Sequence, residues 1–489
     1  MKRFLGSLIA TTNWPRAAAS IAVGTGLVLL NGCLVGPNYK GPPTAQIPPA
    51  YKENSNWKVA QPKDEKLAGN WWEIFGDPQL NTLEQQVNVS NQNLKSAAAQ
   101  YQQSLALLRY NRANYYPTLT TSPSATRIKN ATNRPPSSSI FSGITYNDYV
   151  FPVQLSYQAD VWGRVRRTVE QYRDQAQASA ADLATVNLTM HADLALDYFQ
   201  ARTLDAEERL LNDTVRQYQE ALDLNESLFN EGMASILNVQ QAQTQLETTR
   251  AAAIDVGVLR AQYEHAVAVL VGKPPENFSL PPLPLTTPPP AIPAGLPSDL
   301  LERRPDIASG ERMVAAANAQ IGVATSAYYP LIDLAAAAGF ESGSIATLFQ
   351  GPSVLWSFGP SAVATILDFG RRRAVADQAK AAHNQAVANY RQTVVMGFQQ
   401  VEDNLAALRV LEQEAATERA AVTAAQGALD TAMTQFKGGL TSYLTVTTAQ
   451  SALLTNQVAA VNILGRRMSG AVLLIQALGG GWDASALKT

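Results

Sequence analysis

The chain has 489 residues, with 38 Lys and Arg against 40 Asp and Glu, so its formal net charge is −2. Charged residues make up only 16% of it, while hydrophobic residues make up 46%. The near-balance of charge argues against a nucleic-acid partner, because nucleic-acid-binding proteins carry a basic excess. One cysteine excludes an intrachain disulfide framework, and three histidines leave few groups for a metal site or for catalysis.

Residues 1–32 have the pattern of a secretory signal. Three basic residues and no acid accompany the small or apolar run Ala17–Leu30, which is too short for a confident membrane span. The run leads into Leu30-Asn31-Gly32-Cys33, which resembles a bacterial lipoprotein processing site. We therefore expect Cys33 to become an acylated N-terminus, with this covalent lipid in place of any cofactor. The alternative is an ordinary signal peptide with an incidental cysteine.

No run of about 18 uncharged apolar residues follows the signal. The best candidates are interrupted by charge: Ala251–Val271 contains Asp255, and Val458–Leu478 contains Arg466 and Arg467. Any membrane crossing after the signal is therefore expected to use β-strands.

The remainder of the chain contains an internal sequence repeat. Tyr115-Tyr116-Pro117 recurs as Tyr328-Tyr329-Pro330, and Asp160-Val161-Trp162-Gly163-Arg164 recurs as Asp368-Phe369-Gly370-Arg371 with one residue fewer. Between the halves, Lys273–Leu300 holds ten prolines in 28 residues and is expected to be an extended linker. These features divide the chain into a signal peptide (1–32), an acylated extended segment (33–82), a first repeat (83–272), a Pro-rich linker (273–297), a second repeat (298–479) and a tail (480–489).

Long helices are predicted in both halves. Apolar residues recur every three or four positions from Trp162 to Phe229, a coiled-coil spacing that predicts a helix of about 65 residues and about 100 Å. The turn Glu231-Gly232 ends it, and a second helix is expected over 235–271. The second half repeats this pattern, with helices expected over 371–437 and 442–478 on either side of Gly438-Gly439.

Strands are predicted where polar and apolar residues alternate. Tyr149–Val161 alternates strictly, over a length that suits a tilted membrane strand. Leu331–Glu341 and Ser353–Asp368 alternate too, and a weaker strand that contains Pro123 follows Pro117. The polar positions of the first of these strands are expected to face a water-filled lumen: Gln154, Ser156 and Gln158. A half-buried soluble sheet would alternate in the same way, but the lipoprotein signal favours the membrane.

Four strands cannot close a barrel, and open strand edges are not tolerated in lipid. Three copies of the chain would supply 12 strands, within the known range of barrels. Two copies would give eight, a barrel whose interior is filled by side chains. A homotrimer is therefore expected.

Four segments carry a family resemblance: Cys33–Tyr39, Trp71–Pro78, Leu296–Ile307 and Ala315–Pro330. They resemble the outer membrane factor lipoproteins of tripartite, RND-type efflux systems, the NodT branch of the TolC-like family. The resemblance implies an α+β membrane protein with an internally duplicated TolC-like fold. Its homotrimer would form a 12-stranded outer-membrane β-barrel continuous with a long periplasmic α-helical barrel. The protein would be lipid-anchored in the bacterial outer membrane, would extend into the periplasm, and would dock to a periplasmic adaptor and an inner-membrane pump.

The function implied is a passive exit duct for drugs or toxic compounds. Two alternatives stay open: a duct for type I protein secretion, and a non-conducting coiled-coil lipoprotein. An enzyme is not expected, since no catalytic constellation is found. The acids Asp197, Glu207 and Glu208 beside Arg202 and Arg209 fit a solvated helix face. The three histidines, His191, His265 and His383, are expected to be isolated on helices, without a metal.

The resemblance also assigns the ends of the helical hairpins. Adaptor docking is expected at the two turns, Glu231-Gly232 and Gly438-Gly439. Leu444 matches a leucine that forms an apolar constriction ring in the family, and Leu237 is its counterpart in the first repeat. Thr448 stands where many relatives have an aspartate, with Gln241 as its repeat partner, so an acidic ring and its cation preference are not carried over. The alternative for Leu444 is ordinary helix packing.

Overall fold

The computed structural model describes residues 33–43, 50–54, 69–133, 143–292, 300–483 and 487, so the signal segment 1–32 lies outside it. The chain divides into two compact units. The first comprises Met1–Pro42, Ser104–Ala176 and Met313–Val387, and the second Pro43–Gln103, Gln177–Arg312 and Ala388–Thr489.

The first unit contains an antiparallel sheet in the order β1-β3-β4-β5, with β2 also paired to β3. Its strands are β1 (Thr118–Thr121), β2 (Ser124–Lys129), β3 (Thr145–Ala159), β4 (Leu331–Ser342) and β5 (Val354–Val363). β1 and β2 follow one register along β3 and are separated at Ser122-Pro123, where proline has no N–H to donate. The described strands therefore occupy four positions, as expected from the sequence.

Most of the expected strand boundaries differ from the observed ones, and the differences are largest at the start of β3 and the end of β5. β3 begins at Thr145 rather than Tyr149, because the polar start of the strand pairs with β2. β5 ends at Val363 rather than Asp368, at the last residue that pairs with β4.

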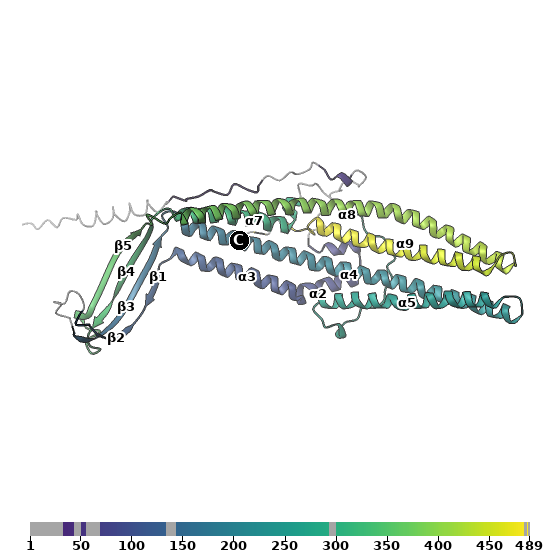
Figure 1. Ribbon diagram of the computed structural model, residues 1–489, viewed down its shortest axis with the longest axis horizontal. Coiled ribbons are helices and arrows are strands. Elements are labelled where there is room, and N and C mark those ends of the chain that lie inside the picture. The colour runs from purple at the N-terminus through teal and green to yellow at the C-terminus, as the bar shows by residue number, and fades with distance from the viewer. Residues whose placement is uncertain are drawn as a thin grey trace, which may run out of the picture. The chain divides into compact units, whose positions relative to one another are not determined.

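Figure 1 shows four long helices, and the second pair repeats the first at a fixed displacement along the sequence. α4 (Arg164–Asn230) and α8 (Arg371–Lys437) each have 67 residues, and α5 (Ile236–Leu270) and α9 (Tyr443–Ala477) each have 35. Every boundary of α8 and α9 lies 207 positions after its counterpart in α4 and α5, as with 164 and 371 or 270 and 477. The predicted duplication and the predicted helix lengths are confirmed.

A glycine in the left-handed backbone region ends each long hairpin helix. After α4, Gly232 has φ +74°, its N–H donates to the Phe229 carbonyl, and the Met233 N–H donates to the Leu228 carbonyl. This is the Schellman arrangement, which satisfies carbonyls that the helix end leaves free. The same pattern follows the other three long helices at the glycines that occupy the equivalent place: Gly272, Gly439 and Gly479.

The described part of the chain also contains shorter helices: α2 (Pro78–Ser90), α3 (Gln92–Arg112), α6 (Leu300–Arg303), α7 (Pro305–Ser326), and the 3-10 turns η1 (Lys52–Asn54), η3 (Trp71–Phe75), η4 (Ala113–Tyr115), η5 (Pro275–Asn277) and η7 (Gly351–Ser353). Asp77 begins α2, since its carboxylate accepts the N–H groups of Gln79 at 2.9 Å and Leu80 at 3.1 Å. Pro78 takes the first helical position, where its missing N–H costs nothing.

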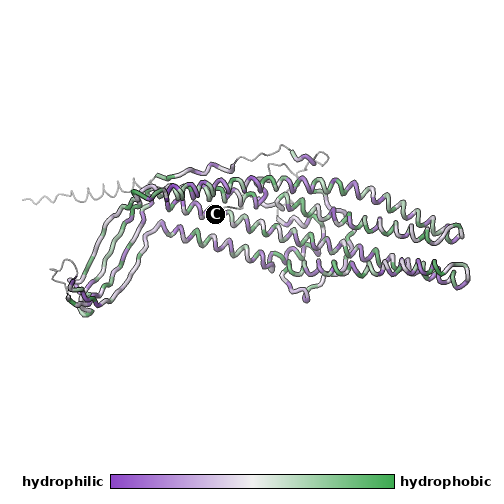
Figure 2. Tube along the Cα trace, in the orientation of Figure 1, coloured by the Kyte–Doolittle hydropathy of each residue, from purple (hydrophilic) through white to green (hydrophobic). Residues whose placement is uncertain are grey.

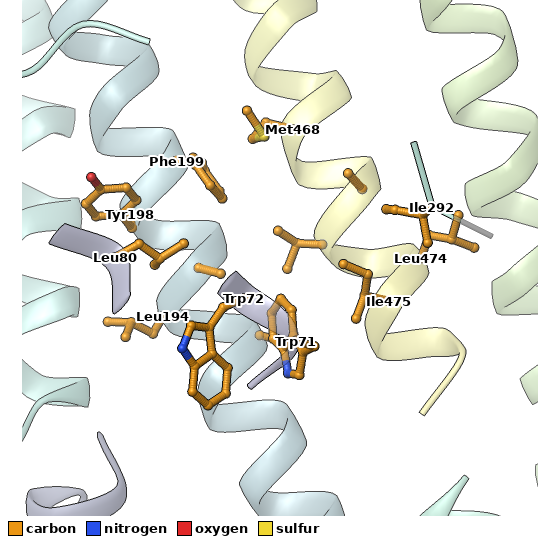
Figure 3. Close-up of a cluster of buried hydrophobic side chains, with 14 of the residues drawn as sticks. Trp71, Trp72, Leu80, Leu194, Tyr198, Phe199, Ile292, Met468, Leu474 and Ile475 are labelled. Carbon is orange, nitrogen blue, oxygen red and sulfur yellow. The ribbon is translucent and has the colours of Figure 1, made fainter. Parts of the chain in front are cut away.

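The core of the second unit lies where η3 and α2 cover α4 and α9 (Figure 3). Trp71 and Trp72 are buried and meet edge to face, with ring centroids 5.8 Å apart. Around them lie residues from α4 and α9, among them Leu194, Leu474 and Ile475. An aromatic side chain buries on the order of 200 Å², so this pair anchors the N-terminal segment of the second unit to the long helices.

The described part of the Pro-rich linker packs against the core of the second unit. It is non-helical apart from η5, as expected, but Leu280 and Ile292 are buried in the same core.

α9 is long and apolar enough to cross a membrane by length and composition alone. However, 44% of its most apolar window is buried inside the protein. Its buried residues include Leu474 and Ile475, which is how a core helix scores on the same test.

Candidate functional site

The register of the sheet places its apolar side chains on one face. Directly paired residues of antiparallel strands point to the same side. Leu155 on β3 pairs with Leu119 on β1 and Ala336 on β4, and Ala336 pairs in turn with Phe358 on β5. Continuing by twos adds Phe151, Val153, Leu334, Phe340, Val354 and Trp356. The alternation along the strands can be followed in Figure 2.

The opposite face carries most of the polar and small residues of the sheet, although Val150, Leu331 and Leu355 lie on it too. Gln154, Ser156 and Gln158, the residues expected to face a lumen, share it. They pair with Ala337, Ala335 and Asp333 on β4, and the first two also pair with Thr120 and Thr118 on β1. The large apolar residues of the other face are exposed in a single chain, including Trp356 and Phe358. Such a face requires a covering of lipid or of a partner.

Cys33 is exposed, and the segment that follows it is docked on the first unit. The anchoring residue is Arg167 on α4, which is only 1% exposed. Its guanidinium donates to the carbonyls of Val35 and Gly36 at 3.1 and 3.2 Å and to the Asn38 side chain at 2.6 Å. The segment leaving Cys33 is therefore fixed within two residues of the cysteine.

Two glycines permit this docking. Gly36 has φ +93°, and a Cβ placed on it would lie 2.5 Å from the Gly322 Cα on α7. A Cβ on Gly322 would in turn lie 2.8 Å from the Arg167 side chain. The segment Cys33–Tyr39 can thus pack closely against α7 because both contacting residues, Gly36 and Gly322, lack a side chain. Sequence reasoning missed Arg167. A signal was present, because the equivalent residue of the second repeat is Ala374, and an arginine found in only one repeat indicates a role confined to that repeat.

The hairpin ends lie in the second unit and pack on one another. Tyr218, Leu246, Tyr443 and Val446 belong to one buried cluster that joins α4, α5, α8 and α9. The turns at Glu231, Gly232, Gly438 and Gly439 are exposed, and apolar side chains beside them are exposed too, among them Met233 and Leu440.

The predicted gate residues occupy equivalent places on two helices. Leu237 is the second residue of α5 and Leu444 the second residue of α9. Thr448 lies one turn further along α9 and is exposed, whereas its counterpart Gln241 is partly exposed. Neither leucine is held in the buried cluster of the hairpin ends, so packing within the chain does not explain them.

His191 is on a helix as expected, but the expectation that it is isolated is wrong. It is buried beneath the Trp72 ring, stacked at 4.4 Å, and its Nδ1 lies 2.5 Å from the Glu84 carboxylate. Its Nε2 lies 3.1 Å from Asn88 Oδ1. Burial raises the pKa of Glu84 well above its usual value and lowers the pKa of His191 to about 4. These shifts favour a neutral pair, in which protonated Glu84 donates to Nδ1 and the Nε2–H donates to Asn88 Oδ1.

The expectation of a solvated helix face is wrong at Arg202, whereas Arg209 is exposed and the three acids Asp197, Glu207 and Glu208 are half-buried. Arg202 is 2% exposed and donates to Asp205 at 2.9 Å, to Gln79 at 2.6 Å and to the Pro281 carbonyl at 2.6 Å. The linker covers this stretch of α4 and supplies that carbonyl. Burial, followed by the charge of Asp193, raises the pKa of Asp197 to about 6, and burial also raises the pKa of Glu207.

No group of three or more potential metal ligands occurs in the described part of the chain.

Comparison with known proteins assigns the family. The family described as "Outer membrane efflux protein" matches residues 83–273 and 296–480. The antibiotic efflux pump outer membrane protein ArpC of Pseudomonas putida is 33% identical over 461 residues, covering 93% of this chain and 94% of the relative. The toluene efflux pump outer membrane protein TtgC of the same species matches with the same identity and coverage. The solved outer-membrane channel OprN superposes with a TM-score of 0.86 at 28% identity, over 92% of this chain and all of that one.

These findings confirm the α+β fold class of the TolC-like channels, the outer-membrane location and the transport rather than enzymatic character expected from the sequence. The chain belongs to the outer membrane efflux protein family.

Proposed function

We propose that three copies of this chain assemble into the exit duct of a tripartite efflux pump. The duct would conduct substrates passively from a periplasmic adaptor and an inner-membrane pump to the cell exterior. Cys33 would carry the lipid that anchors each copy, since several acyl chains hold a protein at a membrane more firmly than one.

The observation that carries this proposal is the sheet of the first unit. It has one face on which large apolar residues gather, an opposite face that carries Gln154, Ser156 and Gln158, and two edges, β1 with β2 and β5, that pair on one side only among the described strands. Unpaired backbone groups are costly in lipid, so such a sheet spans a membrane only when other strands complete it. Three copies give 12 strands around a polar interior, with Gln154, Ser156 and Gln158 facing the lumen.

The hairpin ends are the surface proposed for the adaptor. Glu231, Gly232, Gly438 and Gly439 form exposed turns, and neighbouring apolar side chains give a protein partner an area to cover. Leu444 and Leu237 would constrict the passage there, since apolar rings close pores by excluding water.

The substrate class proposed is organic: antibiotics and solvents such as toluene, the compounds in the names of the relatives at 33% identity.

Two measurements on the full-length protein test the proposal. The purified protein should have the mass of a trimer and should give discrete conductance steps in a planar bilayer. Deletion of the gene should sensitise cells to antibiotics and toluene, and the wild-type gene should restore resistance.

The competing functions give different results. A trimer that conducts, together with a lost secreted polypeptide and unchanged drug sensitivity, would indicate type I secretion. A well-folded protein without conductance would indicate a structural coiled-coil lipoprotein.

A further inference from the structure

The loop that joins β4 to β5 bends over the apolar side of the sheet. This loop, residues 343–353, belongs to the first unit and lies at the end of the sheet opposite the starts of α4 and α8 (Figure 1). Its Phe349 meets Phe340 edge to face, with ring centroids 5.3 Å apart, and meets Phe151 in the same way at 5.9 Å. Phe151 and Phe340 are direct partners on the apolar face, so the loop reaches that face and not the one that carries Gln154.

The outward side chains of the loop are apolar. Ile345 is 69% exposed and Phe349 66% exposed, while Leu348 is buried. On the adjoining strand β5, Val354 and Trp356 are exposed on the same face of the sheet. The exposed apolar surface of the sheet therefore continues onto the loop, and a surface of this kind requires a covering.

Polar groups of the loop are bonded to one another. The hydroxyl oxygens of Ser342 and Thr347 lie 2.7 Å apart, and the Ser353 hydroxyl donates to the Thr347 carbonyl at 2.8 Å. The Thr347 N–H donates to the Ser344 carbonyl at 3.2 Å, and the Gln350 N–H donates to the Thr347 carbonyl at 3.1 Å. A loop in water has no need of these bonds, whereas lipid offers a polar group no partner of its own.

The sequence around the loop is free of charge. Between Glu341 and Asp368, the chain has no Asp, Glu, Lys or Arg. The loop of the other hairpin is different, since it contains Arg134 and follows Lys129. Charged side chains are costly in hydrocarbon, so the β4–β5 loop is the one of the two whose composition suits lipid.

We infer that the β4–β5 loop inserts Ile345 and Phe349 among the acyl chains of the outer leaflet of the outer membrane. This inference rests on the membrane-spanning sheet proposed above. The outer leaflet is the one concerned because the helices of this family extend into the periplasm and the loop lies at the other end of the sheet. The loop is an anchor on the lipid side of the duct, so it stays beside the lumen and leaves the outer mouth clear.

A fluorescent label on the loop tests this inference. The full-length chain with Cys33→Ser and Ile345→Cys is labelled with a nitrobenzoxadiazole dye and reconstituted in phosphatidylethanolamine and phosphatidylglycerol vesicles. Nitroxide-bearing phospholipids should quench the dye several-fold more than iodide present on both sides of the membrane. Ala131→Cys is the matched control, because Ala131 is exposed on the loop of the other hairpin and should show the reverse preference.

Two positions on β3 calibrate the measurement. A label at Val153 gives the response of the apolar face, and a label at Gln154 gives the response of the proposed lumen. If the label at position 345 responds to iodide like that at 154 or 131, while 153 responds to lipid, the anchor is refuted. Shielding of position 345 from both quenchers would also refute it, since a neighbouring chain would then cover the loop. If position 153 itself responds only to iodide, the membrane-spanning sheet fails instead.

A second experiment tests the ring contacts that hold the loop on this face. Phe349→Ala removes both contacts, so the label at position 345 should become several-fold more accessible to iodide, while a label at position 153 is unchanged. Phe358→Ala is the matched control, because Phe358 is exposed on the same face but lies four residues beyond Val354, about 13 Å along the strand. Equal accessibility in the Phe349→Ala variant and in the control would contradict the proposed anchoring by Phe349.

Discussion

Leu444 on α9 and Leu237 on α5 stand 207 positions apart, each as the second residue of its helix, and they are 58% and 56% exposed. A leucine that serves packing is normally buried, because burying its side chain is worth about 2 kcal/mol. Leu444 and Leu237 are exposed instead, at equivalent positions of two helices. Three copies of the chain would bring six such leucines to the hairpin ends.

We therefore predict that Leu444→Ala raises the resting conductance of the trimer several-fold in a planar bilayer. It should also sensitise cells to large hydrophilic antibiotics, because the smaller side chains leave a wider opening that no longer excludes water. Leu259→Ala is the matched control, since Leu259 is another exposed leucine on α5 away from the turn. Loss of trimer without any leak would show that Leu444 serves packing instead.

A second prediction concerns Thr448. Its hydroxyl donates a hydrogen bond to the Leu444 carbonyl at 2.8 Å, one helical turn back on the same helix. The Thr448 side chain is uncharged, so it adds no charge to the pore. Thr448→Asp should add three negative charges to the trimer and shift the reversal potential in a KCl gradient toward cation selectivity. Thr448→Asn is the uncharged control and should leave selectivity unchanged. An unchanged reversal potential in the aspartate variant would place Thr448 outside the conducting path.

The repeat made much of the fold predictable. Once Tyr115-Tyr116-Pro117 is matched to Tyr328-Tyr329-Pro330, each half checks the boundaries of the other, and the helices agree with the expected ranges within two residues. Strand ends were harder, because β5 ends where its partner ends rather than where its alternation ends.

The buried polar residues could not be predicted in the same way. Helical periodicity tells which residues share a face, but it does not tell which segment covers that face. Arg202 is buried by a proline-rich segment that follows it by about eighty residues, and His191 by Trp72, more than a hundred residues earlier. Both contacts are made by the irregular parts of the chain, whose paths carry no periodic signal.

A third prediction tests the two faces of β3. Cysteine at position 154 or 156 should react with a small charged thiol reagent, whereas cysteine at 153 or 155 should be shielded in membranes. The reason is the register, which places Val153 and Leu155 on the apolar face and Gln154 and Ser156 on the other. Labelling of intact membranes followed by mass spectrometry measures this, with the wild-type chain as the background. Reversed or uniform labelling would contradict a membrane-spanning sheet.

A fourth prediction concerns the anchor. Cys33→Ser should abolish acylation while trimers still form, because the strands and helices that assemble do not depend on the lipid. Mass spectrometry of the mature N-terminus measures the modification. An unmodified Cys33, or a mature chain that begins elsewhere, would refute this prediction.

The fifth prediction follows from the neutral pair Glu84 and His191. Between pH 4.5 and the raised pKa of Glu84, the folded chain holds a proton on Glu84 that the unfolded chain has lost, so this group makes folding less favourable as pH rises. Between about pH 4 and 6.5, the unfolded chain holds a proton on His191 that the folded chain lacks, so this group acts in the opposite direction. The two effects oppose each other above pH 4.5. Up to its raised pKa, Glu84 by itself lowers the stability as pH rises, at a limit of about 1.4 kcal/mol per pH unit.

Glu84→Gln separates the two groups, because glutamine still donates to His191 Nδ1 but does not titrate. The variant should lose the decline in stability that Glu84 causes as pH rises, and it should lose stability on acidification from pH 6.5 to 4.5, where His191 now acts alone. Thermal denaturation of the purified protein followed by its helical signal from pH 4.5 to 8.5 measures both changes. Glu220→Gln, at an exposed glutamate of the helix that carries His191, should follow the wild-type profile. If Glu84→Gln also follows the wild-type profile, Glu84 holds no extra proton in the folded chain over this pH range, which would contradict the neutral pair.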